Sequence, residues 1–599
     1  MSSSNAGKVH VDLSSALVEQ WDDAYQWIPV FGAFAAFAVS FTAGANNLAA
    51  PFSTLIGSGV LSIFKASIIA CFIYFPGAGF ASRSTTVADL FSHFLKENQP
   101  NEGFLMWSMV VALLTAAIWL SIATYMELPV SPEQSIQGAL LGIILFTEGF
   151  GYVHMWSKKE KHHFNGGLFW IFLEWTIAPF VACVCACLLF LLFKVLLLRH
   201  ENARKRILAF LAIDFGISAG LLCLFVIFQI VRGLVPVNRW ITMIAVAAAT
   251  LIGAILSLAV AIPIVIKKFK WPDHNKSNKN DKCGNLECET SQEQTEDEGK
   301  NDGDVEDILR DFMQSRVLET VYEEEERSWT SPDRPQHGEQ MQPVSSTTIS
   351  TDQSAIFGQW VEPTTAQLFQ IRSFQRIDKT KSPANATYTY IRNLAKSAIN
   401  PAIEYDKSTL FRHSLAEKYS DMEKFFKFPH LVASFIFALI QSASEIAALT
   451  SPFAAAVDVY RNRPRYSGNW EQLKSVHVTW WCRSIGGLAA AIGFLLCGWR
   501  MTRSLGGKLT YISNSRGLAS QLSSVIAVII VGRLHVPVSP VYAFVGSLIG
   551  VGIADNLWNV NWKLFLKFLC GWVLTIAFCC GIGYVIFCAS TRSPSYIVP

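Results

Sequence analysis

"LPVSPEQSIQGALLG", residues 128–142, is matched near the other end of the chain by "VPVSPVYAFVGSLIG", residues 536–550. Both stretches place Pro-Val-Ser-Pro before an apolar run and keep a Gly, a Leu and a Gly at the same later positions. The first proline cannot continue a helix from upstream, serine is a favoured N-cap, and a proline directly after the cap fits the first helical position. The pattern therefore predicts a new helix directly after Ser131 and another directly after Ser539.

The composition is that of a membrane protein. Hydrophobic residues make up 51% of the 599 positions and charged residues only 16%, and the mean hydropathy is +0.32. A helix that crosses about 30 Å of hydrocarbon needs about 20 mostly apolar residues. Such stretches recur near 28–46, 60–80, 105–126, 168–198, 207–231, 238–266, 430–449, 482–500, 516–533 and 566–588. With the shorter apolar pieces after each Pro-Val-Ser-Pro, we expect an all-α polytopic protein with about 10–12 transmembrane helices in contact with membrane lipid.

Changes in composition divide the chain into five parts. The stretch "SQEQTEDEGKNDGDVED" (291–307) is rich in acidic and polar residues and cannot bury enough apolar surface to offset the entropy of ordering. It belongs to a predicted disordered acidic loop, with short helices expected around 304–324 and 409–427. The predicted parts are a polar segment 1–26, a first membrane block 27–270, the loop 271–427, a second membrane block 428–590 and a tail 591–599.

The positions of the basic residues predict the orientation. "RHENARKR" (199–206) and "KKFK" (267–270) are separated by two expected spans, so they face the same side, and the excess of Lys and Arg marks that side as cytoplasmic. "KKEKHH" (158–163) falls on the opposite side and argues against this orientation. We give the two agreeing clusters more weight and expect a plasma-membrane protein whose central loop is cytoplasmic.

A second, fainter repeat precedes each Pro-Val-Ser-Pro. "GANNLAA" (44–50) and "SASEIAA" (442–448) share the order small, Ala, polar, polar, aliphatic, Ala, Ala. Broken hydrophobic segments at matching places in two halves indicate the central site of a transporter with inverted repeats, near the middle of the membrane. The alternative is a seam of Ala and Gly that only lets helices pack closely.

The candidate binding residues lie in these repeated stretches. A helix that starts within the membrane offers free amides and the positive end of its dipole to an anion, whereas a helix that starts at the membrane surface would not form such a site. Gln134 stands three positions after Ser131, which is the spacing of a capping box. The candidate substrate-binding residues are Asn46, Asn47, Ser53, Thr54, Ser131, Glu133, Gln134, Ser444, Glu445 and Ser539.

At these residues the sequence resembles the inorganic phosphate transporter (PiT) family of cation-coupled symporters. That family carries G-A-N-D-x-A-N and P-V-S-T-T-H in each half, with a long cytoplasmic loop between the halves, and the resemblance covers both membrane blocks. Further matches are "GSGVLS" (57–62), "GGKLTYIS" (506–513), "SRGLASQL" (515–522) and "VNWKLF" (560–565). The resemblance implies inorganic phosphate as the substrate and sodium or a proton as the coupling ion.

The departures from the family pattern fall on the charged and hydroxyl residues. Asn47 replaces the Asp of the first motif, Glu445 replaces that of the second, and neither half keeps Thr-Thr-His. Because an amide offers a cation only a dipole, the loss of Asp should weaken a cation site by more than one ordinary hydrogen bond, about 1 kcal/mol. Glu445 is then the surviving acid of the motifs, with Asn47 as a second candidate sodium ligand. Glu133 could be protonated, bind a cation or point to water.

Two other classes of function are weighed against transport. The lost ligands favour a degenerate family member that acts as a phosphate sensor or receptor. For an enzyme the sequence offers no nucleophile and base arrangement, metal cluster or phosphate loop. The 13 cysteines form no CxxC pair, and no basic patch interleaved with aromatic residues suggests nucleic acid. We therefore expect no enzyme activity and no cofactor beyond the coupling ion, and we keep a homodimer open.

Overall fold

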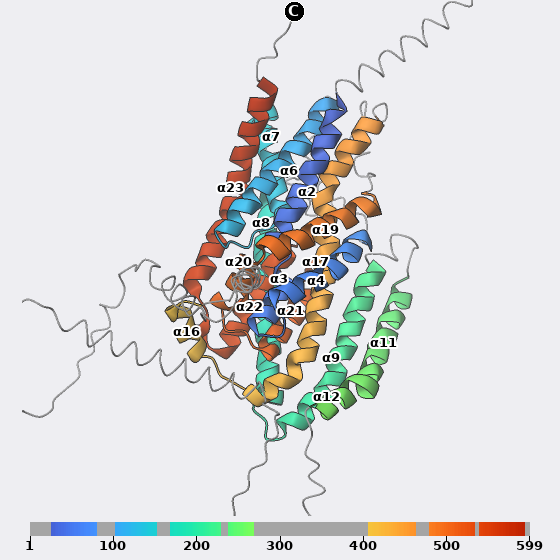
Figure 1. The fold of residues 1–599 in the computed structure, drawn as a ribbon, viewed down its shortest axis with the longest axis vertical. Coiled ribbons are helices and arrows are strands. Elements are labelled where there is room, and N and C mark those ends of the chain that lie inside the picture. The colour runs from blue at the N-terminus through green and yellow to red at the C-terminus, as the bar shows by residue number, and fades with distance from the viewer. Residues whose placement is uncertain are drawn as a thin grey trace, which may run out of the picture. The chain divides into compact units, whose positions relative to one another are not determined.

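The structure is a computed structural model that describes residues 25–80, 102–152, 168–228, 238–268, 405–462, 478–533 and 538–592. These residues form helices and no strand (Figure 1). Nine helices within these ranges are long and apolar enough to cross a membrane, and two shorter apolar helices accompany them. The prediction of an all-α polytopic membrane protein is confirmed.

The α-helices follow one another along the chain with short turns or π-helical extensions between several of them. The α-helices are α2 Trp27–Asn46, α3 Ala50–Gly57, α4 Ile63–Phe80, α6 Glu102–Tyr125, α7 Pro132–Glu148, α8 Leu168–Phe193, α9 Ala203–Val226, α11 Arg239–Leu256, α12 Ile262–Lys268, α16 Lys407–Ser414, α17 Ser420–Arg461, α19 Trp480–Cys497, α20 Trp499–Arg503, α21 Asn514–Arg533, α22 Pro540–Asp555 and α23 Trp562–Arg592. The π-helices are η2 Lys194–Leu198, η4 Ser257–Ala261 and η7 Ser504–Lys508, and the 3-10 turns are η1 Phe150–Tyr152 and η8 Leu557–Asn559.

Most of the predicted linker, including the helix expected around 304–324, lies outside the described residues, as do most of the N-terminal segment 1–26 and the tail 591–599. The end of the linker is described and is helical. It holds α16 and the first turns of α17, which begins at Ser420, eight positions before the predicted start of the second membrane block.

The repeated glycines of the two halves let helices approach closely. α7 packs against α23 and α22 packs against α8. A Cβ at Gly142 would lie 2.0 Å from the carbonyl oxygen of Cys580, and a Cβ at Gly550 would lie 2.1 Å from that of Cys183. Only a glycine fits at such contacts, which is why the spacing recurs in both halves.

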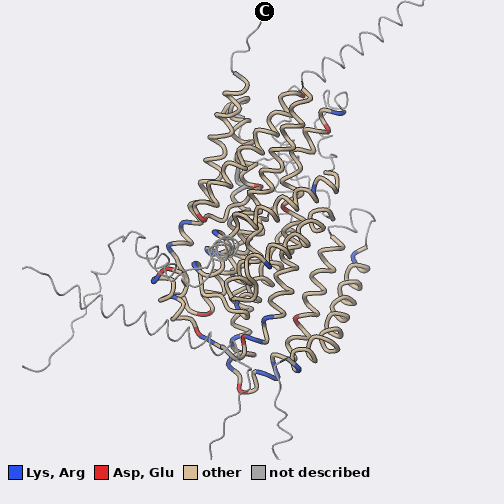
Figure 2. The backbone as a smooth tube through the Cα atoms, viewed as in Figure 1, with Lys and Arg blue, Asp and Glu red and all other residues tan. Residues whose placement is uncertain are grey.

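Charged residues are sparse along the spans and gather near helix ends (Figure 2). Glu417, between α16 and α17, accepts from Lys194 at 2.8 Å and from Arg199 at 2.8 Å. Arg516 on α21 donates to the carboxylate of Asp555 at 2.7 Å and to the carbonyl of Glu417 at 2.6 Å. This network ties the end of the linker to η2, α21 and α22.

Candidate functional site

The first predicted break is present. α2 ends at Asn46 and α3 begins at Ala50. The side-chain nitrogen of Asn46 donates to Thr124 Oγ1 at 3.1 Å and to the carbonyl of Leu128 at 2.9 Å, and its side-chain oxygen accepts from the backbone N–H of Val130 at 3.1 Å. Asn46 therefore fixes the segment that leads into α7 and has little hydrogen-bonding capacity left for a ligand.

α7 begins as predicted, directly after Ser131. The Ser131 hydroxyl accepts from the backbone N–H of Gln134 at 3.4 Å. The second half of the expected capping box is replaced by Tyr542, whose hydroxyl accepts from the Ser131 backbone N–H at 3.0 Å and donates to Gln134 Oε1 at 2.7 Å. All three residues are buried. The hydrogen bond from Ser131 to Tyr542 joins residues that are 411 positions apart in the sequence. It holds the starts of α7 and α22 together inside the protein.

The start of α22 is buried without a side-chain cap. Ser539 is 1% exposed and precedes Pro540, the first helical residue. Its hydroxyl makes no hydrogen bond within the described part of the chain, and neither does Gln134 Nε2 at the opposing helix start. Buried donors without partners are costly, because they have lost their bonds to water. Both groups are thus unpartnered hydrogen-bond donors at or near the start of a helix.

Asn47 and Glu445, the residues in the acid positions of the two motifs, are in direct contact. Asn47 Nδ2 donates to Glu445 Oε2 at 2.5 Å. Gln441 Nε2 donates to Asn47 Oδ1 at 2.9 Å and lies 3.2 and 3.3 Å from the two Glu445 oxygens. Among the described residues no Lys or Arg forms an ion pair with Glu445, and Gln441 Oε1 has no partner. The cluster thus presents a carboxylate and amide oxygens, which suit a hard cation or a proton.

The predicted break in the second half is absent, because α17 runs unbroken through residues 442–448. The reason is local. Residues 442–448 contain no glycine and are mostly good helix formers, whereas the first half has Gly44 and two consecutive asparagines. Farther along α17, Pro452 cannot donate to the carbonyl of Ala448, but the Ser451 hydroxyl donates to that oxygen at 2.8 Å.

Thr54 lies where α3 meets α17 and α21. Its hydroxyl accepts from Gln521 Nε2 at 2.8 Å and is 2.9 Å from Nε2 of the fully buried His430. The other ring nitrogen of His430 lies 3.5 Å from Asn514 Oδ1. The hydrogen-bonding capacity of Thr54 is therefore engaged within the protein, and the contact joins the first break to the second half.

The remaining candidates lie in different surroundings. The hydroxyls of Ser53 and Ser444 donate to carbonyl oxygens of their own helices, at 2.6 and 3.0 Å. Glu133 is half-buried in the first turn of α7, close enough to Glu445 for the two charges to interact. Ser53 and Ser444 are thus helix residues with satisfied hydroxyls, whereas the charge of Glu133 acts on Glu445.

Several residues outside the list of candidates contact the candidate residues. Gln441 stands four positions before Glu445, so a helical spacing could have placed it on the same face. Tyr542 occupies the start of α22, but its partners are in the other half of the chain. Tyr74 donates to the carbonyl of Leu48, within the turn between α2 and α3. His430 and Gln521 meet Thr54 across three helices, and no local pattern signals that contact.

Comparisons with known proteins match this chain to phosphate transporters. The model of the Phosphate transporter family matches residues 43–583. The phosphate-repressible phosphate permease of Neurospora crassa is 23% identical over 582 residues, which cover 92% of this chain and 95% of the permease. A sodium-dependent phosphate transporter of Plasmodium falciparum is 36% identical over 180 residues, which cover 30% of this chain and 25% of that protein.

A solved structure described as the sodium-dependent phosphate transporter has a similar fold. Its TM-score is 0.58 at 16% sequence identity, and the match covers 95% of this chain and 100% of the other. Because the family match spans both halves, including the Pro-Val-Ser-Pro repeats and the cluster around Glu445, the chain belongs to the phosphate transporter family.

Proposed function

We propose that this chain moves inorganic phosphate across the membrane together with a cation, and that the two ligands bind at neighbouring places. Phosphate binds between the starts of α7 and α22. The cation, sodium or a proton, binds at Glu445 with Gln441 and Asn47. Membership of the phosphate transporter family supports the substrate, and a relative named as sodium-dependent supports the coupling.

The observation that carries the phosphate site is the pair of buried donors at the opposing helix starts. Ser539 Oγ and Gln134 Nε2 have no partner within the described residues. Both lie at or next to the positive ends of helix dipoles, where phosphate is stabilised. The Tyr542 hydroxyl bonds to the Ser131 backbone N–H and to Gln134 Oε1, which fixes the start of α22 against the start of α7. The two donors therefore keep their positions when no ligand is bound.

The cation site rests on Glu445. A carboxylate in the membrane interior is costly unless it is paired or protonated. Its neighbours supply neutral amides, and the nearby Glu133 adds negative charge rather than neutralising it. A cation bound there would also offset the repulsion between Glu133 and phosphate at the start of α7.

Radiolabelled phosphate uptake into proteoliposomes tests the phosphate site. Gln134→Glu keeps an oxygen that accepts from Tyr542 but replaces the free N–H donors by a charged oxygen, so uptake should fall strongly. Ser539→Ala should raise the KM for phosphate about fivefold, as expected for one lost hydrogen bond. Ser108→Ala is the matched control, because that hydroxyl donates to Leu105 of its own helix. Uptake unchanged in Gln134→Glu would contradict the proposed phosphate site.

Ion replacement separates transport from coupling. Uptake is measured with sodium replaced by choline and, separately, with the pH gradient collapsed. Loss of uptake in one condition identifies the coupling ion. Uptake that needs neither ion would keep phosphate transport and contradict the cation site. If the wild-type chain takes up no phosphate, the result would favour the sensor alternative. The relatives described above are named as permeases and transporters and offer no support for a sensor.

We further propose that the protein resides in the plasma membrane with its central linker on the cytoplasmic side. α9 packs against η4 and α12, which supports the expectation that the basic residues before α9 and those that end α12 face the same side. Excess Lys and Arg favour the cytoplasmic side. A protease added outside intact cells should leave the linker uncut, and cleavage there would reverse the orientation. Cross-linking in native membranes tests the homodimer.

A further inference from the structure

We propose that a basic patch at one end of α6 and α23 binds the phosphate group of an anionic phospholipid. The patch consists of Arg500 on α20, Lys508 on η7 and Lys567 on α23. All three side chains come from the second half of the chain and meet the end of α6 in the first half. In Figure 2, Lys and Arg gather beside the lower end of α23. None of the three belongs to the phosphate or cation site proposed above.

Two of the cations lie against neighbouring carbonyl groups. Arg500 Nη1 donates to the carbonyl of Tyr125 at 3.1 Å, and Lys567 Nζ donates to that of Met126 at 2.8 Å. The guanidinium of Arg500 also lies 4.6 Å from the centre of the Tyr125 ring. These contacts hold both cations at the carboxyl end of α6, where the helix dipole favours positive charge.

The third cation is paired. Lys508 Nζ lies 2.5 Å from Oε2 of Glu127, so three positive charges meet one carboxylate at this end of α6. Arg500 and Lys567 each make one hydrogen bond within the described residues, whereas a guanidinium has five N–H donors and an ammonium three. Both therefore keep donors for a phosphate group, and charge-assisted hydrogen bonds of this kind are among the stronger ones.

The patch lies where α6 and α23 come together at one of their ends. The ring centres of Phe104, near the beginning of α6, and Phe587, near the end of α23, are 4.9 Å apart. At the other end, Lys567 reaches Met126. The two helices therefore lie side by side and run in opposite directions, with the end of α6 beside the beginning of α23.

The charged residues of this helix pair mark the limits of the membrane. No Asp, Glu, Lys or Arg occurs in residues 103–126 or 568–591. Each stretch is about 36 Å long as a helix, which is enough to cross about 30 Å of hydrocarbon. Glu127 follows the first stretch and Lys567 precedes the second. The patch therefore lies where both helices leave the hydrocarbon, at the level of the lipid headgroups.

Exposed aromatic and apolar side chains surround the patch. Tyr125 is 71% exposed, and Trp562 and Leu566, in the first turns of α23, are 45% and 60% exposed. Trp and Tyr are enriched where a membrane meets water. Inorganic phosphate offers the same charged group as a lipid headgroup, but only a lipid also brings acyl chains to these side chains. This combination favours a lipid over free phosphate.

The end of the linker contacts the segment that carries Lys508. His413 Nε2 lies 2.8 Å from the carbonyl oxygen of Gly507, and the Tyr405 hydroxyl donates to that of Gly506 at 3.4 Å. The patch therefore faces the side of the linker, which the orientation proposed above makes cytoplasmic. The cytoplasmic leaflet carries anionic lipids that attract Lys and Arg near its surface.

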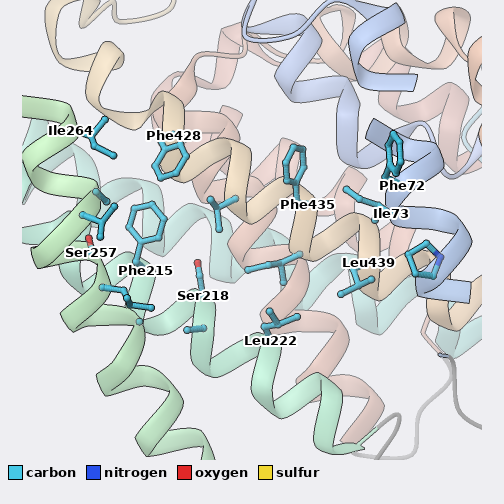
Figure 3. Close-up of a pocket in the computed structure, with 18 residues that line it drawn as sticks. Phe72, Ile73, Phe215, Ser218, Leu222, Ser257, Ile264, Phe428, Phe435 and Leu439 are labelled. Carbon is cyan, nitrogen blue, oxygen red and sulfur yellow. The ribbon is translucent and has the colours of Figure 1, made fainter. Parts of the chain in front are cut away.

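The cavity in Figure 3 does not compete for such a ligand. It has a volume of about 670 Å³ and lies between α4, α9, α17 and the α11–η4–α12 segment. None of the described residues that line it is charged. A phosphate headgroup there would be buried without a positive partner, which is costly.

Native mass spectrometry of the purified full-length chain tests the proposal. The chain is titrated with phosphatidylserine and, separately, with phosphatidylcholine. We expect one tightly retained phosphatidylserine per chain and weaker retention of phosphatidylcholine. A Lys or Arg near an anionic lipid surface strengthens binding about fivefold. Arg500→Gln combined with Lys567→Gln should therefore weaken phosphatidylserine binding about tenfold or more.

A matched control removes the same charge elsewhere. Arg204→Gln combined with Lys205→Gln changes two exposed cations in the first turn of α9 and should bind phosphatidylserine as the wild type does. Lys567→Gln alone is a second patch variant, because this exposed side chain can lose its charge without disturbing the packing. It should weaken binding about fivefold. Melting temperatures in lipid-free detergent show that each variant is folded.

The outcomes separate the possible ligands. Unchanged phosphatidylserine binding in both patch variants would overturn the site, and an equal loss in the α9 control would reduce it to general attraction. Equal retention of phosphatidylcholine by the wild type would overturn the preference for an anionic lipid. Excess inorganic phosphate should not displace phosphatidylserine, and displacement would assign the patch to free phosphate instead of a lipid.

Discussion

The side-chain amide of Asn47 donates a hydrogen bond of 2.5 Å to the carboxylate of Glu445, which lies 398 positions farther along the chain. This bond joins the end of α2, at the first break, to the middle of the unbroken helix α17. The two positions that hold acids in the family motifs therefore lie in direct contact. The chain has one acid and one amide there, so the cation site proposed above contains the carboxylate of Glu445 and the amide of Asn47.

Glu445→Gln should shift the dependence of phosphate uptake on the coupling cation to higher cation concentrations. Glutamine can still bond to Asn47 and Gln441, so the fold is kept while the charge is lost. Hydrogen bonds to charged groups contribute roughly 1.5–3 kcal/mol, so the apparent affinity for the cation should fall about tenfold or more. Uptake is measured as a function of cation concentration. Glu201→Gln, in the exposed turn before α9, is the control and should behave as the wild type. A Glu445→Gln protein with unaltered cation dependence would place the cation elsewhere.

Tyr542→Phe should both destabilise the protein and raise the KM for phosphate. The substitution leaves the Ser131 backbone N–H and Gln134 Oε1 without their partner. Burying such groups unpaired costs roughly 1–3 kcal/mol. Thermal unfolding in detergent and uptake kinetics measure the two effects. Tyr584→Phe, a half-exposed ring on α23, should change neither. An unchanged melting temperature in Tyr542→Phe would mean that its hydroxyl does not hold the helix starts together.

Gly44→Ala should prevent close packing of α2 against α19. A Cβ at this position would lie 1.9 Å from the carbonyl oxygen of Ala490, and that backbone cannot move aside cheaply. Overpacking of this kind costs roughly 1–3 kcal/mol or more. A Cβ at Gly581 on α23 would meet no atom within 4 Å. The Gly581→Ala substitution should therefore change the free energy of unfolding by less than about 1 kcal/mol. Fluorescence-detected chromatography after heating compares the two variants. Equal stability would contradict the close helix contact.

Acid should weaken the attachment of the linker at Glu417. Burial raises the pKa of this carboxyl, but hydrogen bonds from Arg199 and Lys194 outweigh burial and lower the pKa to about 2. A carboxyl with a lowered pKa stabilises the folded state above its unfolded value, about 4.3, and loses that contribution as the pH falls toward 2. Melting temperatures from pH 6 to pH 3 should therefore fall more steeply for the wild type than for Glu417→Gln. Parallel curves would show that the contact adds no stability.

The sequence alone determined the spans and the helix starts, because both depend on local chemistry. A run of about 20 apolar residues has the length and composition of a helix that crosses the hydrocarbon of a membrane. The Pro-Val-Ser-Pro pattern begins a helix after Ser131 and after Ser539, because its first proline cannot continue a helix from upstream and its serine and second proline suit a helix start. The duplicated motifs placed the candidate residues in corresponding parts of the two halves. The arrangement of those halves as inverted repeats stays a prediction.

The tertiary structure decided which of these residues meet. Asn46 carries the polar pattern of a ligand residue, but its partners at Thr124, Leu128 and Val130 make it a structural contact. Gln441 and Tyr542 become parts of the site only because helices distant in sequence pack side by side. The second break was expected by analogy with the first, yet α17 stays helical because residues 442–448 favour a helix. Farther along, the Ser451 hydroxyl donates to the carbonyl of Ala448, which Pro452 leaves without a backbone donor. Local patterns set where helices begin, whereas contacts across the chain set which side chains share a site.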